Sequence, residues 1–79
     1  MTRTQKQILV CILTREGLFG IKELSSSIYK KNGTVQQYVT KLTKDGFLLK
    51  KSNPKDSRKI LISLTEKGKG LATDLYINE

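Results

Sequence analysis

DSRKILISLTEKG, the stretch from Asp56 to Gly68, changes character twice along its length. It begins with charged and turn-forming residues, continues as an alternation of apolar and polar residues, and ends with a threonine in front of a helical pattern. Alternation with a period of two is typical of a half-buried strand. Arg58 and Lys59 therefore lie where this strand begins, at a place where cations cannot support a core and a binding role is indicated.

A partner strand and a final helix flank this segment. Residues 47–51 predict the first strand and residues 59–64 the second, and the turn-rich connection 52–57 joins them into a hairpin with a basic tip. Thr65 is a typical N-cap for the last helix. Its apolar stripe consists of Leu71, Ala72, Leu75 and Tyr76. Gly68 and Gly70 should weaken its first turns by about 1 kcal/mol each relative to alanine.

Three helices are expected before the hairpin. The first starts at one of two capping boxes and ends near Gly17; the boxes are Thr2 with Gln5 and Thr4 with Gln7. A short extended piece over 18–20 leads to a second helix over 21–28, and a polar turn over 29–33 precedes a third helix over 34–44. This order predicts an α+β winged helix-turn-helix.

Charge and length restrict the function. The 79 residues allow a single small domain, 1–79, and the formal charge is +8. Between residues 30 and 59 lie nine basic and two acidic side chains, so +7 of that charge falls in the middle of the chain. Such a concentration favours nucleic acid or an anionic membrane surface as the partner.

The sequence predicts a soluble, cytoplasmic protein. Its longest apolar run, residues 8–13, is too short for a membrane span, which needs about 20 residues. Cys11 is the single cysteine, which excludes an internal disulfide and fits a reducing compartment. A cysteine in such apolar surroundings is usually a small core residue.

Two segments resemble the MarR family of transcriptional regulators: NGTVQQYVTKLTKDGFLLKK, residues 32–51, and NPKDSRKILISLTEKG, residues 53–68. The family pattern has a Gly-hydrophobic step after the recognition helix, then D-x-R in the wing, then L-T-x-x-G. These elements are Gly46-Phe47-Leu48, Asp56-Ser57-Arg58 and Leu64-Thr65-Glu66-Lys67-Gly68. The resemblance covers roughly residues 18–70.

The resemblance implies a homodimeric, sequence-specific binder of double-stranded DNA, a transcriptional regulator of the repressor type. It places recognition helix 34–44 in the major groove and the wing, 47–64, at the minor groove, with Arg58 inserted. A guanidinium suits a narrow groove because it is planar and weakly hydrated. Asp56 would orient Arg58 or hold the turn. Alternatively, Asp56 is only a turn residue and Arg58 only a solvated charge.

The outer face of helix 34–44 is polar once its apolar face is buried. Glutamine can bridge N6 and N7 of adenine, so the predicted base contacts are Gln36, Gln37 and Thr40. Predicted contacts to the DNA backbone are Thr34, Lys30, Lys31, Lys41, Lys44, Lys50, Lys51, Lys55 and Lys59. Family members often carry a basic residue where Gln37 stands, which leaves guanine reading open. The alternative is an ordinary solvated helix face.

The chain is shorter than typical family members, which dimerise and form a small-ligand pocket through extra terminal helices. We therefore expect a minimal member that senses no small-molecule ligand and that pairs through residues 8–13 or the last helix. Some relatives sense oxidants through a cysteine in the first helix, so redox sensing by Cys11 stays an alternative.

Catalysis is not expected, since the sequence has no histidine, metal-ligand cluster or Gly-rich phosphate loop, and no cofactor or metal is implied. Two other functions stay open. A winged helix can act as a protein-protein adaptor, here for an acidic partner. The same features also fit a plasmid or phage protein of replication or segregation.

Overall fold

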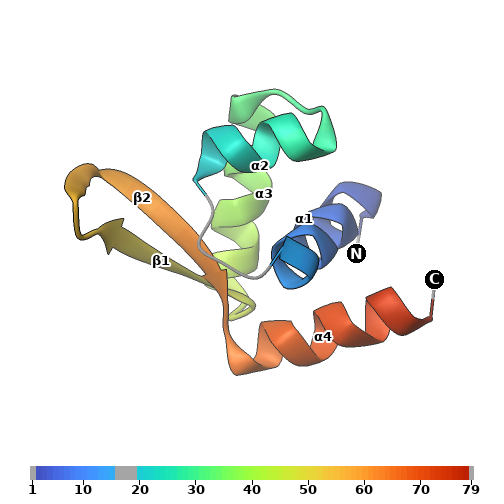
Figure 1. Ribbon diagram of the computed structural model, residues 1–79. Helices are drawn as coiled ribbons and strands as arrows, with labels where there is room; N and C mark the ends of the chain where they lie inside the picture. The colour runs from blue at the N-terminus through green and yellow to red at the C-terminus, as the bar shows by residue number, and fades with distance from the viewer. Residues whose placement is uncertain (1, 16–19, 79) are drawn as a thin grey trace.

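The computed structural model describes residues 2–15 and 20–78, apart from the side chains of Ser57 and Arg58. Its elements follow the predicted order (Figure 1): α1 Arg3–Arg15, α2 Ile21–Ile28, α3 Asn32–Lys44, β1 Leu48–Asn53, β2 Asp56–Leu64 and α4 Glu66–Ile77. The predicted winged helix-turn-helix is confirmed. The short strand predicted over 18–20 falls largely outside the described residues, and Gly20 is the extended N-cap of α2.

The first capping box predicted for α1 is present. The Thr2 backbone N–H donates to Gln5 Oε1 at 2.9 Å, and the Gln5 backbone N–H donates to Thr2 Oγ1 at 3.2 Å. This reciprocal pair satisfies amides that the first helical turn leaves without partners. The helix therefore begins at Arg3, and the prediction that it ends at Gly17 concerns a residue outside the described part.

Helix α3 begins two residues earlier than predicted. The sequence predicts Asn32 and Gly33 in the turn, but they form the first helical turn, and the Val35 N–H bonds to the Lys31 carbonyl at 3.0 Å. The reversal occurs at Tyr29, the first residue of the predicted turn, which has a positive φ of 57°. Because Tyr29 adopts this left-handed conformation, the chain has already turned before it reaches Asn32.

The C-terminus of α3 forms a Schellman motif at the predicted glycine stop. Gly46 has a φ of 87°, a left-handed conformation that favours glycine. The Phe47 N–H donates to the Leu42 carbonyl at 2.9 Å, and the Gly46 N–H donates to the Thr43 carbonyl at 3.1 Å. This motif ends α3 and directs the chain into β1.

The hairpin has a shorter turn than the sequence predicts. The predicted connection covers 52–57, but both strands extend further, and only Pro54 and Lys55 lie between them. Antiparallel pairing is regular from Leu48↔Leu64 to Ser52↔Ile60, and the next pair is Asn53↔Asp56. Between these last two pairs, one step along β1 corresponds to four residues along β2. The turn-forming residues join the strands because cross-strand pairing overrides their local preference.

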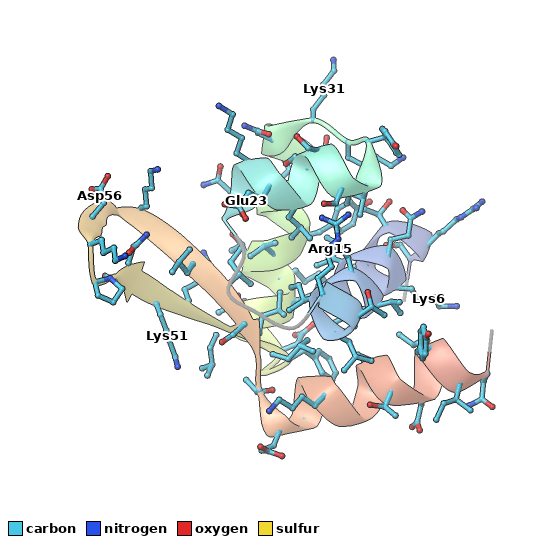
Figure 2. The ribbon with its side chains drawn as sticks, in the orientation of Figure 1. Lys6, Arg15, Glu23, Lys31, Lys51 and Asp56 are labelled. Atoms are coloured by element: carbon cyan, nitrogen blue, oxygen red, sulfur yellow. The ribbon has the colours of Figure 1, made fainter. Side chains whose placement is uncertain are left out.

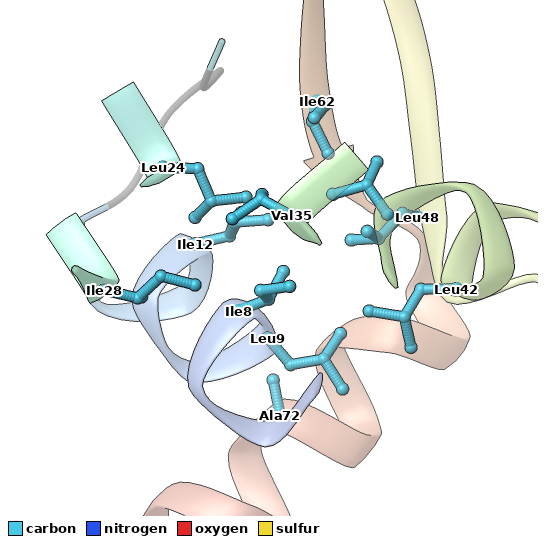
Figure 3. Packing of buried hydrophobic residues seen from close by; sticks show 11 residues of the cluster. Ile8, Leu9, Ile12, Leu24, Ile28, Val35, Leu42, Leu48, Ile62 and Ala72 are labelled. Carbon is cyan, nitrogen blue, oxygen red and sulfur yellow. The ribbon is translucent and has the colours of Figure 1, made fainter. Parts of the chain in front are cut away.

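A single apolar core joins all four helices to the base of the hairpin (Figure 3). Helix α4 packs along α1 (Figure 1), and Ala72 of α4 is fully buried next to α1, as Figure 3 shows. The core residues are Ile8, Leu9, Ile12, Leu24, Ile28, Val35, Val39, Leu42, Leu48, Ile62 and Ala72. Leu71 and Leu75 cover this core from α4 as predicted, whereas Tyr76 leaves the predicted stripe and is 59% exposed. Helix α3 is thereby held with its opposite face in solvent.

The two glycines of α4 have different surroundings. Gly68 is buried, and a Cβ atom built on it would overlap the carbonyl oxygen of Phe47. A Cβ on Gly70 would meet nothing within 4 Å. Gly68 therefore has a packing role that the sequence did not indicate, because its missing side chain lets α4 approach the chain between α3 and β1.

Candidate nucleic-acid interface

The exposed face of α3 carries the three side chains predicted to read bases. Gln36, Gln37 and Thr40 line a shallow hollow of about 440 Å³ together with Gly33. All four residues are exposed, while Val35, Val39 and Leu42 hold the opposite face of the helix in the core. The helix period of 3.6 separates these two faces, as predicted. The hollow can therefore admit a partner without any disturbance of the core.

The Thr40 side chain offers a partner fewer hydrogen-bonding groups than a free hydroxyl would. Its Oγ1 donates to the Gln36 carbonyl at 2.8 Å, which uses its single proton within the helix. Toward a base, this side chain presents an acceptor and a methyl group only. The two glutamines each offer a donor and an acceptor, so they have the larger capacity for reading base edges.

The start of α3 can receive a phosphate. Lys31 is the N-cap and makes no side-chain capping bond, so the N-cap side chain accepts from none of the first-turn amides. Thr34 stands in that first turn and is half-buried. Lys30 and Lys31 are exposed immediately before it, and Figure 2 shows Lys31 extending away from the body of the protein. Amides, helix dipole and two cations converge here, which is the arrangement that binds anions.

A second hollow, of about 480 Å³, lies between the start of α2, α3 and the wing. Three lysines from three elements reach it: Lys22 of α2, Lys50 of β1 and Lys59 of β2. Gln36 lines this hollow as well as the one on α3. Helix α3 and the wing are thus parts of one continuous surface, with Gln36 where they meet.

The remaining predicted lysines do not all share this surface. Lys41 and Lys44 are exposed in the last turn of α3, and Lys55 is exposed at the hairpin turn. Lys51 follows Lys50 along β1, so it lies on the opposite face of the hairpin. Figure 2 shows Lys51 on the side of the wing away from α2. The structure therefore separates it from Lys50 and Lys59.

The wing tip carries the predicted minor-groove pair. Asp56 begins β2 and stands at the tip, where it is half-buried (Figure 2). The backbone of Arg58 lies in the irregular part of the pairing, and its side chain is outside the described structure. A turn bond is made by Asn53, whose Oδ1 accepts from the Lys55 N–H at 2.9 Å. The orientation of Arg58 by Asp56 stays a prediction.

Sequence reasoning missed two exposed residues of this region. Lys22 reaches the hollow beside the wing. It is far from the wing in sequence, so the sequence did not indicate that the two lie together. Tyr29 is 93% exposed in the turn between α2 and α3 and has a positive φ, which is uncommon for an aromatic residue. The sequence placed Tyr29 in the turn over 29–33 but gave no sign of its left-handed conformation.

The described residues hold no group of three or more His, Cys, Asp or Glu side chains able to bind a metal ion. Cys11 is a free, half-buried cysteine that packs against the core. Within the same residues, no helix has the length and apolar character that crossing a membrane requires.

Comparison with known proteins identifies the family. The model of a family described as transcriptional regulator SarA/Rot matches residues 1–75. The chain belongs to this family. SarA/Rot members are transcriptional regulators by description, and the prediction of a transcriptional regulator agrees with that description.

Two relatives support the assignment. SarZ of Staphylococcus aureus, an HTH-type transcriptional regulator, is 33% identical over 75 residues, 95% of this chain and 50% of that protein. YkoM of Bacillus subtilis, an uncharacterized HTH-type regulator, is 30% identical over 73 residues, 92% of this chain and 47% of that protein. The chain thus spans about half the length of these two relatives.

The fold is that of MarR-type regulators, as the wing motif predicted. A point mutant of Lactococcus lactis ZitR matches with a TM-score of 0.91 and 23% identity, over 98% of this chain and 51% of that one. MarR from E. coli matches with a TM-score of 0.87 and 22% identity, over 96% of this chain and 56% of that one. At these identities the likeness concerns the fold.

Proposed function

We propose that this SarA/Rot family chain binds double-stranded DNA as a sequence-specific transcriptional regulator of the cytoplasm. The observation that carries the proposal is the position of Gln36 in both hollows, one on α3 and one beside the wing. A helix of this width fits a major groove, and the lysines around the two hollows suit flanking phosphates. Gln36, Gln37 and Thr40 then contact bases, and Arg58 enters the minor groove from the wing.

Fluorescence anisotropy with a random duplex across a series of salt concentrations tests this proposal. Neutralisation of about five to eight phosphates gives a slope of roughly −4.5 to −7 for log K against log salt. A slope near zero, or the absence of affinity at low salt, would contradict DNA binding and favour an adaptor for an acidic protein. Binding sites selected from a random library then distinguish a promoter-type site from one of replication or segregation.

A homodimer is part of the proposal, because two-fold proteins match two-fold DNA sites. The exposed apolar side chains of Tyr76 and Ile77 at the end of α4, 59% and 71% exposed, supply contact area for a second copy. We expect a pseudo-palindromic site with half-sites about one helical turn apart. Light scattering of the free protein and of its DNA complex measures this, and a monomer in both would contradict the dimer.

A further inference from the structure

The end of the recognition helix is fastened to the start of α4 across the base of the wing. The Thr65 hydroxyl donates to the Gly46 carbonyl at 2.6 Å, and the Thr65 N–H donates to the Phe47 carbonyl at 3.1 Å. Thr65 also caps α4, because its Oγ1 accepts from the Gly68 N–H at 2.9 Å. A shift of α4 against α3 would break the two bonds to Gly46 and Phe47 together.

Lys67 adds a side-chain link to this junction. Its Nζ donates to the Asp45 carbonyl at 3.1 Å, at the C-cap of α3, and lies 4.7 Å from the centroid of the Phe47 ring. Its stem passes Gly46, since a Cβ built on that glycine would be 3.9 Å from Lys67 Cδ. The ammonium thus contacts a helix C-terminal carbonyl and an aromatic face, two groups that attract cations.

We propose that Lys67 is a positioning residue for DNA recognition. It contacts the end of α3 that is remote from Gly33 and Gln36, and it acts by holding the direction of α3 relative to α4. The side chains that read bases project from α3, so a small tilt of the helix displaces them all. Shape-dependent contacts to bases tolerate such displacement poorly, whereas contacts to phosphates through flexible lysines tolerate it well.

This inference rests on the proposed function, and two consequences distinguish Lys67 from an ordinary phosphate contact. Loss of a phosphate contact weakens binding to all duplexes and reduces the salt slope by about 1. Loss of a positioning contact weakens binding to the selected site and leaves both the random-duplex affinity and the salt slope unchanged. Methionine at this position keeps the stem and removes the ammonium.

The experiment compares Lys67→Met, Lys67→Arg and Lys69→Met on the selected site and on a random duplex. Lys69 is an exposed lysine of the same helix, so its replacement removes the same charge. We expect Lys67→Met to lose roughly 2- to 30-fold in affinity for the selected site alone. Lys67→Arg, which keeps the donor and the cation, should retain the wild-type preference, as should Lys69→Met. Equal losses on both duplexes, or the same loss for Lys69→Met, would overturn the proposal.

A second measurement is independent of DNA. Spin labels at Gln37→Cys and Asp74→Cys, in a Cys11→Ser background, report the distance between α3 and α4 by double electron–electron resonance. Lys67→Met should shift or broaden that distance distribution, and Lys69→Met should not. If wild type fails to bind DNA, the proposed function fails, and the label distances alone decide the role of Lys67. An unchanged distribution for Lys67→Met would overturn it.

Discussion

Gly68 faces the carbonyl oxygen of Phe47 so closely that a Cβ atom on the glycine would overlap that oxygen. The obstacle is backbone, which cannot rotate away as a side chain can. Gly68→Ala therefore has to push α4 away from the chain between α3 and β1. We expect it to destabilise the fold by roughly 1–3 kcal/mol, the range typical of overpacking. Thermal or urea unfolding measures this loss.

Gly70 is the matched control, since a Cβ there meets nothing within 4 Å. Gly70→Ala should stabilise α4 by up to about 1 kcal/mol, because alanine is the better helix former. In a domain of this size, 1 kcal/mol corresponds to a shift of roughly 4–8 °C in Tm. Similar effects of the two substitutions on stability would show that the close approach of Gly68 to Phe47 does not cause the loss in Gly68→Ala.

Thr65→Ala removes both bonds of the junction hydroxyl, the 2.6 Å bond to the Gly46 carbonyl and the cap of the Gly68 N–H. Loss of an N-cap threonine costs about 1 kcal/mol, with a range of roughly 0.5–2. Unfolding experiments on Thr65→Ala and Thr65→Ser compare loss with rescue, because serine keeps the hydroxyl. If serine were as destabilising as alanine, the methyl group rather than the hydroxyl would be responsible.

Gln36→Ala and Gln37→Ala test the reading of bases. Each should cost about 1–3 kcal/mol on the selected site and little on random duplex, because a bidentate contact to adenine is lost. Competition binding against both duplexes at one salt concentration gives the comparison. Thr40→Val, which keeps the methyl group and removes the acceptor, should cost less. Equal losses on both duplexes would make the glutamines backbone contacts.

Arg58 is tested on two duplexes, one with a narrow A-tract where the wing binds and one with G·C pairs there. Groove insertion depends on groove width, so Arg58→Ala should weaken binding more on the A-tract duplex. Arg58→Lys keeps the charge but is more strongly hydrated and loses the planar fork, so it should not restore binding. Full rescue by lysine, without dependence on the tract, would reduce Arg58 to one more charge on the wing.

Local signals were sufficient to predict most of this fold. The Thr2–Gln5 capping box, the Gly46 stop and the Thr65 cap are short-range features, and each appears in the structure where the sequence indicated. The wrong boundaries lie where tertiary contacts compete with local preference. Strands β1 and β2 extend through cross-strand pairing into much of the loop expected over 52–57. Because the chain turns at the left-handed Tyr29, Asn32 and Gly33 belong to α3.

The candidate site was predictable in part. Helical periodicity alone places Gln36, Gln37 and Thr40 on one exposed face. It does not predict that Lys22 lies near Lys50 and Lys59, because that proximity depends on how the wing packs against the start of α2. Nor does periodicity distinguish Gly68 from Gly70, since only the approach of another segment of backbone separates them.

The irregular pairing at the wing tip has a consequence for evolution and engineering. Side chains of a strand alternate between faces, so one residue inserted between Ile60 and Leu64 would turn Ile62 from the core to solvent. Beyond Ser52↔Ile60 the regular register has already ended. Residues can be added or removed there without reversing any buried side chain. The reach of the wing is therefore adjustable separately from the stability of the core, and relatives with longer or shorter tips can share one scaffold while touching different lengths of a partner.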